Sequence, residues 1–277
     1  MRIPIYQVDA FADRVFAGNP AAVCPLESWL ETEVMQAIAA ENNLSETAFF
    51  IANGDAYDIR WFTPKAEIDL AGHPTLATAH VIFTEIEPGR RSVRFNTKPG
   101  DVLSVVEDDG VLIMDFPSRP PAPAEGVDEM AEALGARPEL FLAARDAFAV
   151  FGSEEELRAL SPDMGRLTEF AFLGTIATAP GDEFDFVSRF FAPRHGIPED
   201  PVTGSAHCEL IPYWAARLGK TTLRARQISE RGGDIYCEYL GERVKIGGRA
   251  ATFMRGKIEL KQSARNIRRR DMTDVSR

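Results

Sequence analysis

Two short loops of this 277-residue chain place a glycine directly before an apolar stretch that can form a helix. They are Gly72-His73 and Gly204-Ser205. The first N–H groups of a helix lack intrahelical acceptors and lie at the positive end of its dipole, so such loops attract anions. Each loop alone is equally consistent with an ordinary helix start. Because the loops match, we predict that Gly72 and Gly204 bind the carboxylate of one small substrate.

Glu46 is a candidate acid–base residue. It lies in Asn43-Leu44-Ser45-Glu46-Thr47-Ala48-Phe49, beside apolar neighbours at the start of an expected strand. Burial would raise its pKa towards the range in which a carboxyl group can both accept and return a proton. Taken by itself, the residue is more simply interpreted as a carboxylate of a surface loop, which is the commoner situation for glutamate.

Asp200 and His73 are the candidate partners of Glu46. Asp200 precedes a proline and stands shortly before Ser205, so its side chain could cap the loop or helix there, and in a cleft it could also donate a proton. His73 would feel the positive end of a helix dipole, which favours a neutral imidazole suited to hydrogen bonding or proton relay. A structural role is the alternative for both residues.

We expect neither a metal nor an organic cofactor. The other side chains that could ligate a metal are His80, His207, Cys208 and Glu209. Their spacing matches no familiar ligand pattern, and we expect them to be packing residues. The stretch Thr203-Gly204-Ser205-Ala206-His207 lacks the GxSxG pattern of a nucleophilic serine, and no GxGxxG or Walker-type GxxxxGK[ST] motif occurs.

The elements around Glu46 can be predicted from local patterns. A capping box at Ser28-Trp29-Leu30-Glu31 and apolar residues four apart predict a helix from about 29 to 40. Two β-rich runs, 47–51 and 57–62, flank Asn53-Gly54-Asp55 and predict a hairpin. The residues after Gly72-His73-Pro74 predict a helix that is apolar nearly all round, so other structure must enclose it.

Further strands are expected at 92–96, 102–107 and 111–116, before a proline-rich stretch at 117–123 where we place a domain boundary. The second half then repeats the first. Arg60-Trp61-Phe62-Thr63-Pro64-Lys65 is matched by Arg189-Phe190-Phe191-Ala192-Pro193-Arg194, and an aspartate, a glycine and an apolar helix follow each. A repeat of this length predicts two paired domains.

Composition narrows the class of protein. Hydrophobic residues make up 45% and charged residues 26%, as in a folded globular chain. The formal net charge of −11 argues against nucleic-acid binding, apart from a terminal basic run that is more simply a solvated end: Arg265, Arg268, Arg269 and Arg270. No stretch is apolar enough to suggest a membrane span, and three scattered cysteines favour the cytoplasm.

Five motifs, taken in order and spacing, resemble the phenazine-biosynthesis PhzF-like family along essentially the whole chain. They are Val8-Asp9-Ala10-Phe11, Gly18-Asn19-Pro20-Ala21-Ala22-Val23, Asn43-Leu44-Ser45-Glu46-Thr47-Ala48-Phe49, Gly72-His73-Pro74-Thr75 and Glu199-Asp200-Pro201-Val202-Thr203-Gly204-Ser205-Ala206-His207. The resemblance implies an α+β fold like diaminopimelate epimerase, with two pseudo-symmetric domains that each wrap a curved, mostly antiparallel sheet around a central helix. We expect domains at 1–118 and 119–277, with a segment at about 262–277 that can return to the first.

The resemblance also implies an activity: isomerisation by proton transfer between carbons, as on a dihydro-hydroxyanthranilate, in the cleft between the domains of a homodimeric protein. Its acid–base glutamate falls on Glu46, and its cleft partners fall on His73, Asp200 and Ser205. The related epimerases and racemases use two facing cysteines, which these loops lack. An amino-acid epimerase or racemase, or a binding protein for small carboxylates without catalysis, remain the alternatives, and the substrate is not fixed by these motifs.

Overall fold

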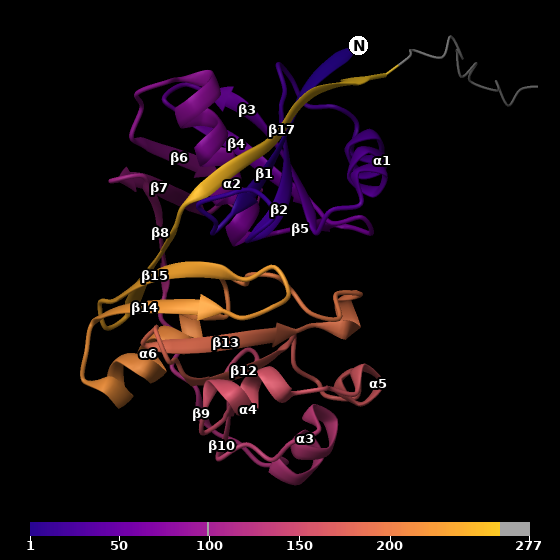
Figure 1. Ribbon diagram of the computed structural model, residues 1–277. Helices are drawn as coiled ribbons and strands as arrows, with labels where there is room; N and C mark the ends of the chain where they lie inside the picture. The colour runs from indigo at the N-terminus through magenta and orange to yellow at the C-terminus, as the bar shows by residue number, and fades with distance from the viewer. Residues whose placement is uncertain (99, 261–277) are drawn as a thin grey trace, which may run out of the picture.

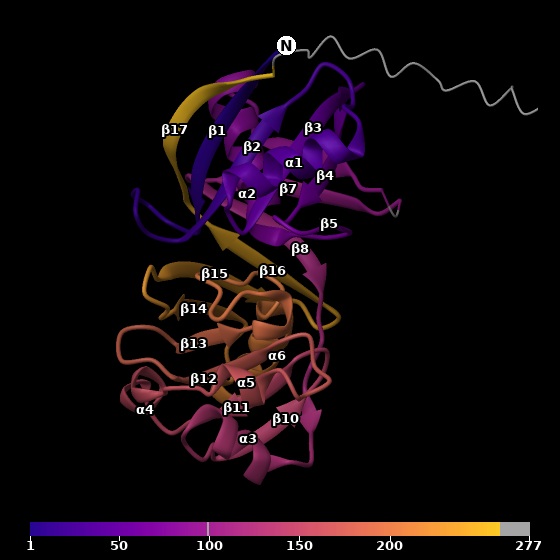
Figure 2. The same cartoon turned by 90° about the vertical axis from the view of Figure 1, so that its right-hand side faces the viewer.

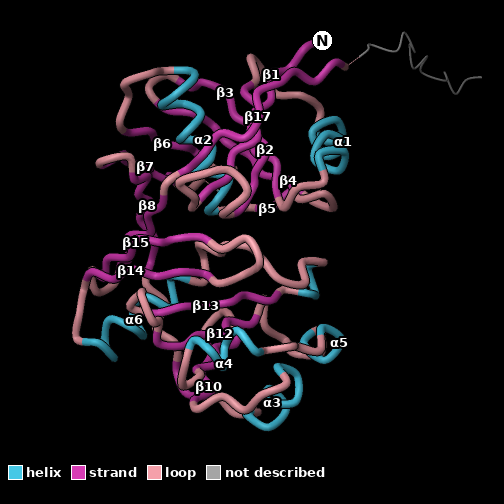
Figure 3. Tube along the Cα trace, in the orientation of Figure 1, coloured by secondary structure: helices cyan, strands magenta, loops and turns pink. Residues whose placement is uncertain are grey.

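The computed structural model describes residues 1–98 and 100–260 as two stacked halves (Figure 1). Both halves are built mainly from strands (Figure 3). The terminal basic run and the 262–277 segment lie outside the described residues. None of the helices in the described ranges is both long and apolar enough to cross a bilayer.

The sheet of the N-terminal half contains the predicted hairpin. Its strands are β1 (Arg2–Ala10), β2 (Asn19–Pro25), β3 (Glu46–Asn53), β4 (Ala56–Phe62), β6 (Ser92–Asn96), β7 (Val102–Asp108) and β8 (Val111–Pro117). Along this order the neighbouring pairs run antiparallel, parallel, antiparallel, parallel, antiparallel and antiparallel. A two-residue strand, β5 (Glu67–Ile68), adds to β4. The hairpin of β3 and β4 turns at Gly54, whose positive φ of 60° suits glycine.

The C-terminal half repeats the same series of pairings. Its strands are β10 (Leu140–Ala143), β11 (Ala147–Val150), β12 (Thr175–Pro180), β13 (Phe186–Phe191), β14 (Thr222–Gln227), β15 (Gly233–Tyr239) and β16 (Arg243–Gly248). The pairs again run antiparallel, parallel, antiparallel, parallel, antiparallel and antiparallel. The repeat predicted from the sequence is therefore confirmed by the strand order, and the fold is the expected α+β architecture of two pseudo-symmetric halves.

The two halves are joined by strand pairing, and one strand from each half is added to the sheet of the other. β8 and β16, which end the two series, pair with each other. The strand after β8, β9 (Ala122–Pro123), then pairs with β10 of the C-terminal half. The strand after β16, β17 (Ala250–Glu259), crosses back and pairs with β1 along its length, as the yellow ribbon of Figure 1 shows. The described chain therefore returns to the first half within 250–259, ahead of the expected segment, and the division at 118/119 stays a prediction.

Each half wraps its sheet around one helix. α2 (Gly72–Val81) continues as a π-helical turn, η1 (Ile82–Ile86), and eight of the ten residues of α2 are buried. This confirms the helix that the sequence predicted to be enclosed. Its counterpart is α6 (His207–Leu218), which ends at Gly219 with a left-handed φ of 65°. Both helices contribute to one continuous core that spans the two halves.

Further helices cover the outer faces and are seen from their own side in Figure 2. They are α1 (Thr32–Asn42), α3 (Val127–Leu134), α4 (Glu154–Ala159), α5 (Met164–Leu167) and the 3-10 turn η2 (Pro193–His195). The helix predicted to begin near Trp29 begins at Thr32, and no side chain caps it, so the capping-box interpretation was wrong. It ends, as expected, at asparagine, with Asn43 in the left-handed conformation.

The repeat extends to side-chain contacts. The guanidinium group of Arg60 forms a two-point hydrogen-bonded pair with Glu67, at 2.7 and 2.9 Å. Its repeat counterpart Arg189 forms the same fork with Glu199, at 2.8 and 2.9 Å. Both pairs are largely buried, and they fix the loop that follows β4 and β13 at equivalent places. These loops approach the candidate active site from opposite halves.

The core around α6 gives a stability prediction. Trp214 is fully buried, stacks on Phe186 with centroids 5.6 Å apart, and donates from Nε1 to Thr178 Oγ1 at 2.9 Å. Trp214→Phe loses that hydrogen bond and leaves a cavity where the larger indole was, which together cost at least about 1–2 kcal/mol. We expect Tm to fall by roughly 2–8 °C in a calorimetric scan. Trp29→Phe, at a half-buried tryptophan, is the control, and an equal shift in both variants would contradict this role.

Candidate active site

A cavity of about 680 Å³ lies between the two halves and contains both candidate carboxylates. The N-terminal half supplies Glu46 with its neighbours 43–45 and the loop 63–66. The C-terminal half supplies Arg145, the turn 194–197 and Asp200 with Thr203. Concave sites of this size with convergent polar groups are typical of small-molecule binding.

Glu46 begins β3 and is only 9% exposed, so the surface-loop alternative is wrong. One of its oxygens, Oε2, lies 3.1 Å from Nε2 of His73. Burial, and secondly the nearby charge of Asp200, raise the pKa of Glu46 to about 8. A carboxyl group in this state holds its proton at neutral pH and can release and recover it with little cost, as acid–base chemistry requires.

His73 is the second residue of α2 and is buried. Burial lowers its pKa to about 3, although a hydrogen bond to the backbone of Pro20 opposes the shift. The imidazole is therefore neutral at physiological pH, as the helix-dipole argument predicted. Among the described residues, neither His73 Nε2 nor Glu46 Oε2 has a partner of good hydrogen-bond geometry, although the two atoms are close. Both atoms are buried, so this unused hydrogen-bonding capacity lies between Glu46 and His73, behind the cavity lining.

Asp200 is held by a network of neutral donors. Asn19 Nδ2 donates to Asp200 Oδ1 at 2.8 Å, and the hydroxyl of Thr203 donates to Oδ2. Burial raises the pKa of Asp200 to about 6, and these two hydrogen bonds limit the rise. The capping alternative is wrong for the helix, because Ala206 is the N-cap of α6 and no side chain caps it.

Gln227 fixes the backbone of this loop. Its Nε2 donates to the Asp200 carbonyl at 2.7 Å, and its Oε1 accepts from the Thr203 N–H at 2.9 Å. Asn19, which comes from β2, also bridges the halves by donating to the Val202 carbonyl at 2.9 Å. The position of the Asp200 carboxyl group is therefore determined by both halves of the molecule.

The two glycine loops face each other across the halves. A Cβ atom placed on Gly72 would lie 3.8 Å from the Cα of Gly204, so the starts of α2 and α6 meet. Ser205 accepts a hydrogen bond from Arg145 Nη2 at 2.8 Å. The cavity is lined by Glu46 and Asp200, whereas Gly72, Gly204, Ser205 and His73 lie behind its surface. The six residues predicted from the sequence therefore lie in one region. Two of them line the cavity, and the other four lie behind that lining.

Sequence reasoning missed four residues of this region. Thr203 and Asn19 were inside the motifs but were not recognised as hydrogen-bond partners of Asp200. Gln227 lies in β14 and Arg145 in the short turn between β10 and β11, and no local pattern distinguishes either. Only the order of the family motifs could have indicated Asn19, whereas Gln227 and Arg145 require the tertiary structure.

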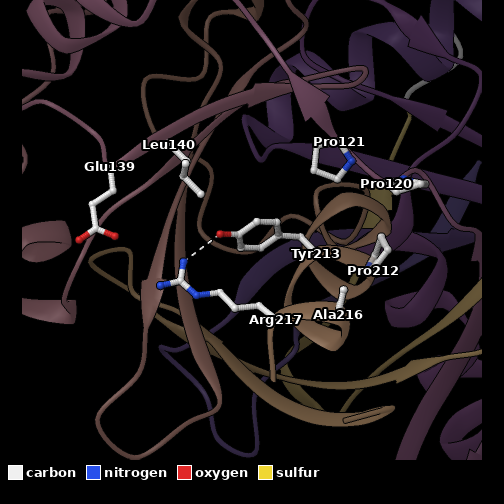
Figure 4. Close-up of a pocket in the computed structure, with 8 residues that line it drawn as sticks. All are labelled: Pro120, Pro121, Glu139, Leu140, Pro212, Tyr213, Ala216 and Arg217. Carbon is white, nitrogen blue, oxygen red and sulfur yellow. Dashed lines mark hydrogen bonds between the residues drawn. The ribbon is translucent and has the colours of Figure 1, made fainter. Parts of the chain in front are cut away.

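A second cavity, of about 690 Å³, lies elsewhere on the C-terminal half and is shown in Figure 4. It is lined largely by prolines and aliphatic groups, and Arg217 donates to the hydroxyl of Tyr213 at 2.8 Å within it. The lining of this second cavity contains no carboxyl–imidazole pair, so the cavity between the halves is the candidate active site. Within the described ranges, no group of three His, Cys, Asp or Glu side chains could hold a metal ion.

The raised pKa of Glu46 makes a prediction about stability. Because the folded-state pKa of about 8 exceeds the ordinary 4.5, protonated Glu46 stabilises the fold fully below pH 4.5 and this contribution is lost as the pH rises through 8. Glu46→Gln cannot ionise. Its Tm relative to wild type should rise by at least about 3 °C between pH 5 and pH 8.5. If the difference in Tm between Glu46→Gln and wild type were the same at both pH values, the raised pKa of Glu46 would be contradicted.

The fold alone defines the structural class of this protein. A hydroxyproline epimerase of Agrobacterium vitis superposes with a TM-score of 0.59 at 9% identity, covering 93% of this chain and 92% of that one. The architecture is therefore that of the epimerase-like proteins with two pseudo-symmetric α+β halves. Similarity at this level of identity indicates the fold only.

The family is established by closer matches. The model of the PhzC-PhzF family, phenazine biosynthesis-like proteins, matches residues 8–256, and the chain belongs to this family. An uncharacterized isomerase of Pseudomonas aeruginosa is 50% identical over 260 residues, covering 94% of this chain and all of that protein. A PhzF-family structure from Enterococcus faecalis superposes with a TM-score of 0.92 at 48% identity, covering 94% of this chain and all of that one. These relatives support an isomerase.

Proposed function

We propose that this protein is a cofactor-independent isomerase that moves a proton on a small carboxylate substrate by acid–base catalysis in the cavity between its halves. One observation carries the proposal. Glu46 is a buried carboxyl group whose pKa is raised to about 8, it lies 3.1 Å from a neutral imidazole, and it shares the cavity with Asp200. A titratable group perturbed in this way, with a specific partner in a cleft, is typical of a catalytic acid–base residue.

The proposed reaction has two proton transfers. The ionised form of Glu46 removes a proton from a carbon next to an unsaturated or carboxylated group, and the electrons of the broken C–H bond move into that conjugated system. The carboxyl group of Glu46 lines the cavity and exchanges its proton with solvent, and it then protonates a second carbon, which forms a new C–H bond. The product is an isomer, and no oxidant or reductant is consumed. His73 can hydrogen-bond to Glu46 in either state, and Asp200 steadies or relays a proton.

The starts of α2 and α6 supply the proposed anion site. Negative charge on the substrate increases when the C–H electrons enter the conjugated system. The backbone N–H of Gly72 belongs to the first residue of α2 and that of Gly204 to the turn that leads into α6, and in this proposal they stabilise the charge from behind the cavity lining. Ser205 completes the loop at α6. This arrangement favours a substrate whose carboxylate is conjugated with the reacting carbons, as in a dihydro-hydroxyanthranilate.

An amino-acid epimerase or racemase is the second candidate among enzymes. The two-thiol form of that chemistry needs reactive cysteines facing the substrate, and burial raises the pKa of Cys208 to about 11. Burial also raises the pKa values of Cys24 and Cys237, and all three thiols are buried. These thiols are poorly suited to form thiolates. The remaining alternative is a binding protein that holds carboxylates without catalysis.

The test separates these three functions. The protein, without added cofactor, is incubated with dihydro-hydroxyanthranilate and a panel of small amino and hydroxy acids, and products are identified by NMR. A product with a shifted double bond supports the isomerase. A stereoisomer of the starting acid would transfer the proposal to an epimerase. Binding of carboxylates with no change in any of them would instead favour the binding protein.

We also propose a homodimer in the cytoplasm with a domain boundary at 118/119, the expected domains being 1–118 and 119–277 apart from the strand β17, which returns to the first. The three cysteines are unpaired, which agrees with a reducing compartment. Light scattering coupled to size-exclusion chromatography measures the oligomeric state, and a mass of a single chain of 30.6 kDa would contradict the dimer.

A further inference from the structure

We infer that Arg145 binds the carboxylate of the substrate, beside the start of α6, as a specific cation of this site. Arg145 lies in the turn between β10 and β11 and lines the same cavity as Glu46 and Asp200. The inference rests on the proposed function only in taking the substrate to be a small carboxylate.

The guanidinium group of Arg145 is anchored on one side. Its Nη2 and Nε atoms donate to Asp146 Oδ2 at 2.7 and 3.1 Å, and Nη2 also donates to Ser205 Oγ at 2.8 Å. Among the contacts of the described residues, Nη1 has no hydrogen-bond acceptor. The side chain is 29% exposed, so the remaining N–H groups can reach a ligand. A planar guanidinium held in this way is suited to a carboxylate.

A pair of buried acidic residues holds the guanidinium group of Arg145 in place. Asp146 and Glu209 are both fully buried, and the Asp146 N–H donates to Glu209 Oε1 at 3.2 Å. Burial and the charge of Asp146 raise the pKa of Glu209 to about 8. A protonated Glu209 adds no charge beside the ion pair of Arg145 and Asp146, which keeps the guanidinium in place.

Asp200, with a pKa of about 6, is the largely ionised acid of the cavity at neutral pH, and the other charges around the cavity agree with this role. His73 is neutral, and the raised pKa of Glu46 keeps that group largely uncharged at neutral pH. Lys65 and Arg194, which are equivalent positions of the internal repeat, line the same cavity from the two halves. The cations at the mouth can attract an anion, whereas Arg145 alone among these three is tied to Ser205 at the start of α6.

The test measures charge-selective binding with turnover removed. Benzoate and its neutral isostere benzamide are titrated calorimetrically into Glu46→Gln protein, with and without Arg145→Gln or Arg145→Lys. We expect benzoate to bind the parent more tightly than benzamide. Arg145→Gln should weaken benzoate binding by roughly 10- to 100-fold, the effect of one charge-assisted hydrogen-bonded contact, and should leave benzamide unchanged. Arg145→Lys should restore part of the loss.

Arg243→Gln is the matched control, because Arg243 is exposed and pairs with Asp115 away from the cavity lining. Equal weakening of benzoate and benzamide by Arg145→Gln would indicate a structural role and overturn the inference. Benzoate that binds no better than benzamide to the parent would also overturn it. This binding test does not depend on proton transfer. If Arg145→Gln weakened the binding of benzoate alone and wild type isomerised no substrate, the proposed function would be refuted and the role of Arg145 would stand.

Discussion

Glu46→Gln is expected to lower kcat by about 10²–10⁴-fold, the usual contribution of a positioned acid–base group, while the fold stays intact. Glutamine keeps the shape of the side chain and a hydrogen-bonding group near His73, but it can neither take nor return a proton. The measurement is the initial rate of isomerisation with the substrate found in the NMR panel, together with circular dichroism of the variant. The raised pKa of Glu46 adds a pH dependence: kcat/KM should rise with pH towards an apparent pKa of about 8.

The matched control is Glu41→Gln, on the exposed face of α1. It makes the same chemical change outside the cavity lining and should leave the rate within a factor of two or so. Undiminished turnover in Glu46→Gln would show that another group carries the proton. A loss of rate accompanied by an unfolded spectrum would count against Glu46→Gln as a probe, and the acid-limb behaviour of wild type would then be decisive.

Asp200→Asn is expected to have the second largest effect, a fall in kcat/KM of roughly 10- to 100-fold. The charge of Asp200 helps to raise the pKa of Glu46, so its removal should lower that pKa and shift the pH–rate profile to lower pH. The fold should tolerate the change, because an asparagine oxygen can accept from Asn19 while its NH₂ group donates to the Thr203 hydroxyl. The pH–rate profile is measured for both proteins.

Asp115→Asn serves as the control for Asp200→Asn, since Asp115 is an exposed partner of Arg243 and should leave the profile unchanged. An Asp200→Asn profile that keeps the wild-type midpoint would contradict electrostatic coupling between the two carboxyl groups. A midpoint that moves to higher pH would contradict the sign of the coupling.

Local patterns predicted much of the fold. The hairpin of β3 and β4 follows from two alternating runs around Asn53-Gly54-Asp55, and α2 follows from a continuous apolar stretch after Pro74. These signals depend on neighbouring residues, so they can be read without tertiary contacts. The internal repeat gave the relation between the halves, because equivalent segments fold into equivalent elements around Arg60 and Arg189.

The missed features depend on contacts between distant segments. The return of β17 to β1 joins residues about 250 positions apart, and its strand pattern does not specify its partner. Gln227 and Arg145 belong to the site only because β14 and the β10–β11 turn reach Asp200 and Ser205. Likewise, the residues around Glu46 by themselves favoured an exposed loop carboxylate, and its burial is set by the enclosing structure.

The chemistry of the site also follows from burial more than from residue type. Glu46 and Asp200 are ordinary carboxylic acids, and His73 is an ordinary imidazole. Removal from water raises the pKa values of the two acids to about 8 and 6 and lowers that of the imidazole to about 3. Burial likewise raises the pKa values of the three thiols, which disfavours racemisation by two cysteines.

Solvent exchange tests the central claim most directly. Wild type and Glu46→Gln are incubated side by side in deuterated water with dihydro-hydroxyanthranilate and the acid panel, without added cofactor, and carbon-bound deuterium is followed by NMR. The account predicts deuterium at the carbon that receives the proton in the wild-type reaction and none above background with Glu46→Gln. Equal incorporation by both proteins, or wild-type incorporation that depends on an added cofactor, would contradict it.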